Sequence, residues 1–121
     1  MLGKPVAGFL FLVAGASLAQ TAATPVATVH YSCAEGKTLV ADYFDGPTRT
    51  APDGRPVPGG RVILTLADGK KLALPQTLSG SGIRYANEDE TFVFWSKGDT
   101  AFVEQGRNQT VTYKDCAGRR K

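Results

Sequence analysis

Hydrophobic and polar residues alternate along most of the chain. In residues 26–33, for example, Val29 and Tyr31 alternate with Thr28 and His30. A period of two residues is typical of a β-strand with one buried face, and no stretch shows a sustained helical period. The pattern predicts short strands at residues 26–33, 37–44, 61–67, 70–75, 82–87, 90–96, 100–105 and 109–115.

Tight turns separate these strands. Asp68-Gly69 is a strong hairpin signal because glycine accepts a positive φ without steric cost, and Gly98 and Gly106 mark two further turns. Eight short strands with tight turns predict an all-β fold, an eight-stranded antiparallel β-barrel in which the strands follow one another. Closing the sheet removes exposed edges, and a two-layer sandwich is the alternative.

Residues 45–61 interrupt this rhythm. The segment is rich in proline and glycine and has no periodicity. Proline cannot donate a hydrogen bond to a sheet, so we expect a long, weakly packed and mobile surface loop. A linker between two domains is disfavoured because too few residues precede it to form a core.

The N-terminus has the pattern of a secretory signal peptide at residues 1–19. Lys4 precedes an apolar run that ends in the small residues Ser17 and Ala19, which predicts cleavage after Ala19 and a mature domain at 20–121. A transmembrane helix needs about 20 apolar residues, so this run is too short to span a bilayer comfortably. No cysteine follows the run, so we expect a free periplasmic protein without a stable membrane anchor.

Cys33 and Cys116 are the two cysteines of the chain. In an oxidising compartment an isolated pair of this kind predicts a disulfide. Closing so long a loop contributes on the order of 4 kcal/mol in a chain-entropy model. A redox or metal pair is the alternative, but there is no Cys-x-x-Cys and His30 is the sole histidine. We therefore predict no metal site and no cofactor.

Charge and composition point away from nucleic acid and from catalysis. The formal net charge of +3 falls to about +2 without Lys4. Arg119, Arg120 and Lys121 form a basic tail, and the other charges are interspersed, which is typical of an ordinary solvated surface. His30 sits on a polar strand face, and the acidic run at residues 88–90 is best explained as a solvated turn. The aromatic residues Tyr85, Phe92, Phe94 and Trp95 are better explained by core packing than by a stacking platform. We predict neither an enzyme nor a nucleic-acid partner.

Two motifs carry a resemblance to a known family. The stretch Ser81-Gly82-Ile83-Arg84-Tyr85, followed by Phe94-Trp95-Ser96-Lys97-Gly98-Asp99, resembles the two signature motifs of the bacterial C-type lysozyme inhibitor family, the membrane-bound and periplasmic MliC/PliC group. The likeness extends to "YSCAEGKTLVADYF", to "LTLADGKKLALPQTLSGSG" and to "TVTYKDC", and so covers about residues 29–116.

The resemblance implies an eight-stranded barrel that inhibits C-type lysozyme. It further implies that two motif loops enter the cleft of the enzyme, where a serine and a lysine meet the catalytic carboxyl groups. By residue match these are Ser81 and Lys97, and Tyr85 is expected to brace the serine loop. Without Cβ atoms, Gly82 and Gly98 let narrow loops enter such a groove.

The chemistry of the target suits these residues. A C-type lysozyme places two carboxyl groups across the scissile bond and keeps one of them protonated. Lys97 brings a positive charge, while the Ser81 hydroxyl can donate or accept a hydrogen bond and therefore suits either protonation state. Because lysozymes of this class are strongly cationic, the acidic residues 88–90 are expected to present a negative rim.

Other readings of the same residues remain open. The two motifs taken alone are also explained as ordinary hairpin turns with common surface residues. A small-ligand-binding barrel and an envelope protein that binds peptidoglycan are the alternative functions.

Overall fold

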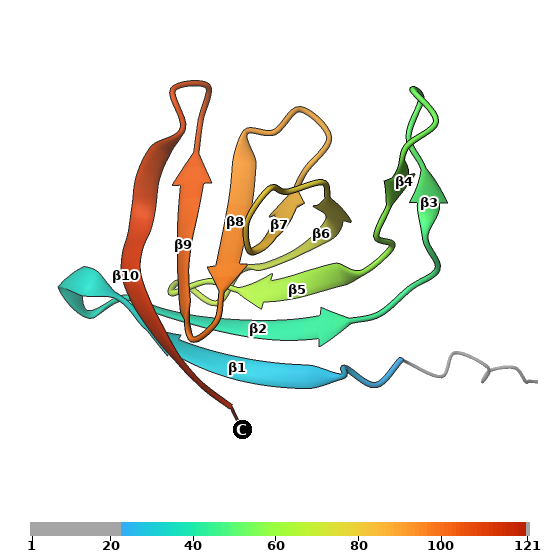
Figure 1. Ribbon diagram of the computed structural model, residues 1–121. Helices are drawn as coiled ribbons and strands as arrows, with labels where there is room; N and C mark the ends of the chain where they lie inside the picture. The colour runs from blue at the N-terminus through green and yellow to red at the C-terminus, as the bar shows by residue number, and fades with distance from the viewer. Residues whose placement is uncertain (1–22, 121) are drawn as a thin grey trace, which may run out of the picture.

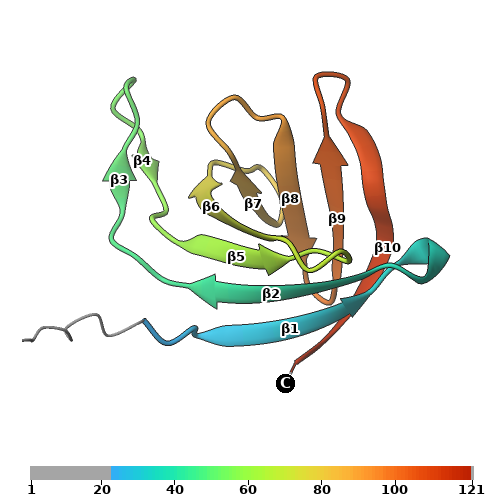
Figure 2. The ribbon, with the colours of Figure 1, turned by 180° about the vertical axis from the view of Figure 1, so that it is seen from behind.

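The computed structural model describes residues 23–120 and confirms the predicted barrel. Eight antiparallel strands close in the order β1-β10-β9-β8-β7-β6-β5-β2 (Figures 1 and 2). No helix in this range is long and apolar enough to cross a membrane. The predicted signal peptide and its cleavage site lie outside the described residues. The barrel strands are β1 (Ala27–Ser32), β2 (Thr38–Phe44), β5 (Arg61–Thr65), β6 (Lys71–Thr77), β7 (Ile83–Ala86), β8 (Phe92–Lys97), β9 (Thr100–Gln105) and β10 (Thr110–Arg120).

The last strand is longer than predicted and closes the barrel. We expected it to end at residue 115, followed by a basic tail, but β10 continues to Arg120. Its final residues pair with β1, from Ser32 opposite Ala117 to Val29 opposite Arg120. The prediction failed because these residues lack apolar alternation, whereas the pairing is made by backbone groups that any residue supplies.

The barrel interior is filled by apolar and aromatic side chains. Phe94 is fully buried and packs edge-on against Tyr31, with ring centroids 6.0 Å apart. Trp95 lies on the outer face and stacks on Phe102 of the neighbouring strand. The predicted core packing is therefore confirmed for Tyr85 and Phe94, and Phe92 packs against the core, whereas the prediction was wrong for Trp95. The core cluster comprises Tyr31, Leu39, Ala41, Val62, Leu64, Leu74, Tyr85, Phe94, Ala101, Val103, Tyr113 and Cys116.

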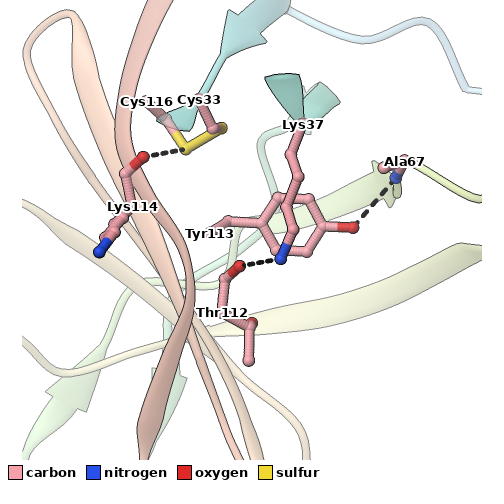
Figure 3. Close-up of a disulfide and its surroundings, with 7 residues drawn as sticks. All are labelled: Cys33, Lys37, Ala67, Thr112, Tyr113, Lys114 and Cys116. Carbon is pink, nitrogen blue, oxygen red and sulfur yellow. Dashed lines mark hydrogen bonds between the residues drawn. A yellow bond between two sulfur atoms is a disulfide. The ribbon is translucent and has the colours of Figure 1, made fainter. Parts of the chain in front are cut away.

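The predicted disulfide is present where β1 and β10 close the barrel. Cys33 and Cys116 are bonded, with their Cα atoms 3.9 Å apart (Figure 3). Beside them, the Lys37 ammonium donates to the carbonyl of Thr112 at 2.7 Å and lies 5.0 Å from the centre of the Tyr113 ring. The Tyr113 hydroxyl in turn accepts a hydrogen bond from the amide of residue 67 at 3.1 Å. We call this group, residues 33, 37, 67, 113 and 116, the seam.

The segment between β2 and β5 is not the irregular loop that we predicted. It contains a small hairpin, β3 (Arg49–Thr50) with β4 (Pro56–Val57), which stands beside the barrel (Figure 1). Val57 is buried, and the Arg49 guanidinium donates to the carbonyl of Gln76. At the neck of the hairpin, a Cβ on Gly59 would overlap the carbonyl oxygen of Pro47, so the two segments of the chain touch there. Strands of two residues are too short to show alternation, which explains the wrong prediction.

Candidate functional site

The two predicted binding segments lie side by side in the structure. One is the loop 78–82 that leads into β7, and the other is the turn 97–100 that joins β8 to β9. The antiparallel pairing of Ile83 with Ser96 brings residue 82 next to residue 97. We call these two segments the loop pair.

The backbone of the serine loop is held by a neighbouring hydroxyl. Ser79 Oγ accepts from the Ser81 amide at 3.2 Å and donates to the Ser81 carbonyl at 2.6 Å. Serine commonly stabilises turns in this way. The Ser81 side chain itself is exposed and makes no hydrogen bond within residues 23–120. The loop therefore presents a free hydroxyl on a fixed backbone.

Gly82 determines how closely the two segments approach. Its φ is +69°, and a Cβ at this position would lie 2.7 Å from the carbonyl oxygen of Ser96 and 3.2 Å from Cβ of Lys97. Both the conformation and the space therefore require glycine. The result is that the serine loop packs directly against the stem of the lysine.

The lysine lies at the end of β8, beside a two-residue turn. Gly98 begins this turn with a φ of +59°. The Thr100 hydroxyl donates to the Lys97 carbonyl at 2.9 Å, and the Gly118 amide donates to the Asp99 carbonyl at 2.7 Å. The turn is thus held from β9 and from β10. The Lys97 side chain is exposed, and its ammonium has no hydrogen-bond or ion-pair partner among the described residues.

Tyr85 occupies a different place from the other predicted site residues. It is only 4% exposed and packs in the interior against Tyr43 and Phe94, at centroid distances of 5.9 and 6.1 Å. Burial raises the pKa of Tyr85 to about 12. A buried ring does not touch a partner protein, so any part that Tyr85 has in binding is support from inside the barrel.

A hollow of about 300 Å³ connects the two segments on the outer face of the sheet. Ser81 and Lys97 both line it, together with the aromatic residues Trp95 and Phe102. The prediction missed these two aromatic residues as neighbours of the site. The signal was present, because Trp95 is two residues before Lys97 and so lies on the same face of β8.

The expected negative rim is wrong. Residues 88–90 lie in the turn that follows β7 and precedes β8, whereas the loop pair precedes β7 and follows β8. Strands of four and six residues separate the acids from the loop pair by roughly 13–20 Å. Hydrogen bonds from the Thr91 side chain and backbone lower the pKa of Asp89, and Glu90 forms an ion pair with Arg84 at 3.1 Å. These acids thus organise their own turn.

Comparison with known proteins agrees with the resemblance that the two motifs carry. A family profile described as "Membrane-bound lysozyme-inhibitor of c-type lysozyme", MliC, matches residues 55–112. A relative from Yersinia enterocolitica named "Membrane-bound lysozyme inhibitor of C-type lysozyme" is 39% identical over 90 residues, which cover 74% of this chain and 61% of the relative. A protein of the same name from Cupriavidus necator is 31% identical over 94 residues, covering 75% of this chain and 65% of the relative. The chain is therefore similar to members of the MliC family over most of its described length.

The part of the chain that matches the MliC family includes the loop pair. Residues 55–112 contain Ser81, Gly82, Tyr85, Lys97 and Gly98, but neither cysteine of the seam. The chain spans a little over three fifths of the length of the two curated relatives, 61% and 65%. No solved structure matches the chain significantly.

Proposed function

We propose that this protein inhibits C-type lysozyme by placing the loop pair in the active-site cleft of the enzyme. One observation carries the proposal: a hydroxyl and an ammonium, both exposed and both without partners among the described residues, project from segments that touch at Gly82. The names of the two relatives, both membrane-bound inhibitors of C-type lysozyme, support the choice of partner.

The two groups differ in what they would contact. Lys97 carries a charge on a flexible stem and is suited to the ionised carboxylate of the cleft. Ser81 can donate to an ionised carboxylate or accept from a protonated carboxyl group. It therefore suits the second catalytic carboxyl group of the cleft in either protonation state. Removing one member of a desolvated charge pair leaves the other charge buried alone, so loss of the Lys97 ammonium should weaken binding more than loss of the neutral Ser81 hydroxyl.

The backbone around these groups allows them to enter a groove. Nothing lies within 4 Å of a Cβ built on Gly80 or on Gly98, so both segments are narrow at their tips. The paired strands β7 and β8 hold the bases of the two segments at a set spacing. A rigid pair of narrow loops loses little conformational entropy on binding.

The proposed location is the cell envelope. Both relatives are named membrane-bound. The signal peptide predicted at residues 1–19 would direct this chain to the cell envelope as well. We propose the periplasm as the place where the protein protects peptidoglycan from lysozyme.

The test is lysis of a cell-wall suspension by a C-type lysozyme, with and without the purified protein. We expect inhibition that saturates at one inhibitor per enzyme, and a complex that co-elutes in size-exclusion chromatography. A parallel experiment sediments the protein with purified sacculi in the absence of lysozyme. Protection from lysis without any complex, together with co-sedimentation, would replace the proposal by peptidoglycan binding.

A further inference from the structure

A second hollow lies behind the loop pair, on the inner side of the barrel. It has a volume of about 220 Å³, and its walls include Gly82, Lys97 and Gly98 from the loop pair. Lys97 is the last residue of β8 and borders both the outer and the inner hollow. The opposite wall comes from β1 and β10 and ends at Arg120. The hollow thus joins the predicted binding lysine to a residue that the sequence suggested was part of a solvated tail.

The strand register explains why Arg120 is there. Tyr31 points into the barrel and pairs with Gly118. Val29 lies two residues before Tyr31 and its partner Arg120 lies two residues after Gly118, so both belong to the same inner face. Arg119 pairs with His30 and belongs to the outer face. The two neighbouring arginines therefore differ in direction although they carry the same charge.

Gly118 keeps this wall open. A Cβ at this position would lie 2.7 Å from both the Tyr31 ring and a methyl group of Val29. Its amide also donates to the Asp99 carbonyl, which ties the end of β10 to the lysine turn. The position of Arg120 relative to Lys97 is therefore set by backbone contacts.

The charged residues that line the hollow favour the binding of one anion. Lys97 and Arg120 are positive, and Asp99 is the third charged residue of the lining, which leaves one positive charge in excess. The floor has hydroxyl groups: those of Tyr31 and Tyr43 are 2.6 Å apart, and Ser96 lies beside them. A single carboxylate would neutralise the rim and find hydrogen-bond donors below it.

We propose that this hollow receives one carboxylate side chain of the lysozyme and that Arg120 is a second cationic contact beside Lys97. The inference rests on the proposed function, since it adds a residue to the same interface. It assigns a binding role to the end of β10 that the family motifs do not include.

The experiment compares Arg120→Gln with Arg119→Gln, which removes the same charge one residue away. Inhibition constants and dissociation rates are measured with a C-type lysozyme for the full chain, beside melting curves. We expect Arg120→Gln to weaken inhibition about tenfold, mainly through faster dissociation. Arg119→Gln should stay within about threefold, because it changes only the long-range field, which salt screens.

A second variant tests the charge balance without removing Arg120. Asp99→Asn keeps the backbone contact with Gly118 and removes the negative charge of the rim, so inhibition should become a few-fold tighter. Wild-type inhibition by both Arg120→Gln and Asp99→Asn, with Lys97→Ala still impaired, would overturn this inference and leave the proposed function standing. A wild-type protein that does not inhibit at all would overturn the proposed function first.

Discussion

The seam and the loop pair use the same kinds of residue in opposite ways. Each contains a lysine and a hydroxyl group. In the seam, the Lys37 ammonium and the Tyr113 hydroxyl both have hydrogen-bond partners beside the disulfide. In the loop pair, Ser81 and Lys97 are exposed and have no side-chain partner within residues 23–120.

This difference distinguishes residues that stabilise the fold from residues that are available to bind a partner. Polar groups that are bonded inside the fold stabilise it, and removing one leaves its partner without a bond. Polar groups that are exposed and unbonded contribute little to folding but are free to contact another molecule. Mutations in the seam should therefore lower the melting temperature, whereas mutations in the loop pair should lower inhibition.

The largest effect on stability is expected from removing the disulfide. Replacing Cys33 and Cys116 by alanine frees a loop that spans 83 residues of sequence. We expect a loss on the order of 4 kcal/mol and a fall in melting temperature of roughly 15–30 °C. Inhibition measured well below the new melting point should persist, and its disappearance in a folded double variant would show that the seam also shapes the site.

High pH should destabilise the interior behind the loop pair. Burial raises the pKa of Tyr85 to about 12, and it raises that of Tyr43 as well, whereas an unfolded tyrosine titrates near 10. Between these values the unfolded state loses protons that the folded state keeps, so stability is full below pH 10 and falls as the pH rises to 12.

For Tyr85 alone the expected loss is about 2–3 kcal/mol by pH 12, measured by urea unfolding at a series of pH values. Tyr85→Phe is the control, because it removes the titrating group and keeps the ring. An equally steep fall in that variant would contradict the assignment to Tyr85.

A smaller effect is expected from Tyr113→Phe. The ring and its contact with Lys37 remain, but the partly buried amide of residue 67 loses its acceptor. We expect a loss of about 1–2 kcal/mol by chemical denaturation and unchanged inhibition. An unchanged stability would mean that water replaces the hydroxyl and that the seam is weaker than its bonding suggests.

Among these changes, deletion of the β3–β4 hairpin should lower the folding stability least. The variant lacks residues 48–58 and joins Pro47 directly to Gly59, because these two residues already touch in the structure. The lost burial of Val57 should cost about 1 kcal/mol after the shorter connection is taken into account. Circular dichroism and a melting curve would check this, and a molten or unfolded product would show that the hairpin belongs to the core.

The sequence predicted the strands well because alternation and glycine turns are local signals. The strand predicted at residues 90–96 corresponds to β8 (Phe92–Lys97), and the turn predicted at Gly98 is present. The pattern missed β3 and β4, which are two residues long, and the end of β10, where backbone pairing replaces apolar alternation. The motifs also predicted Ser81 and Lys97 as site residues, but not that Gly82 packs the serine loop against Lys97, because that depends on the pairing of two strands.

The central claim is that Ser81 and Lys97 act on lysozyme and not on the fold. The direct measurement is inhibition of a C-type lysozyme by the Ser81→Ala, Lys97→Ala double variant, beside Lys70→Ala, which removes an exposed lysine from the distant β5–β6 turn. We predict a loss of at least about 100-fold in inhibition for the double variant, a change in folding stability below about 0.5 kcal/mol, and wild-type inhibition for Lys70→Ala. Undiminished inhibition by the double variant, or a loss of inhibition that accompanies a collapsed melting temperature, would contradict the claim.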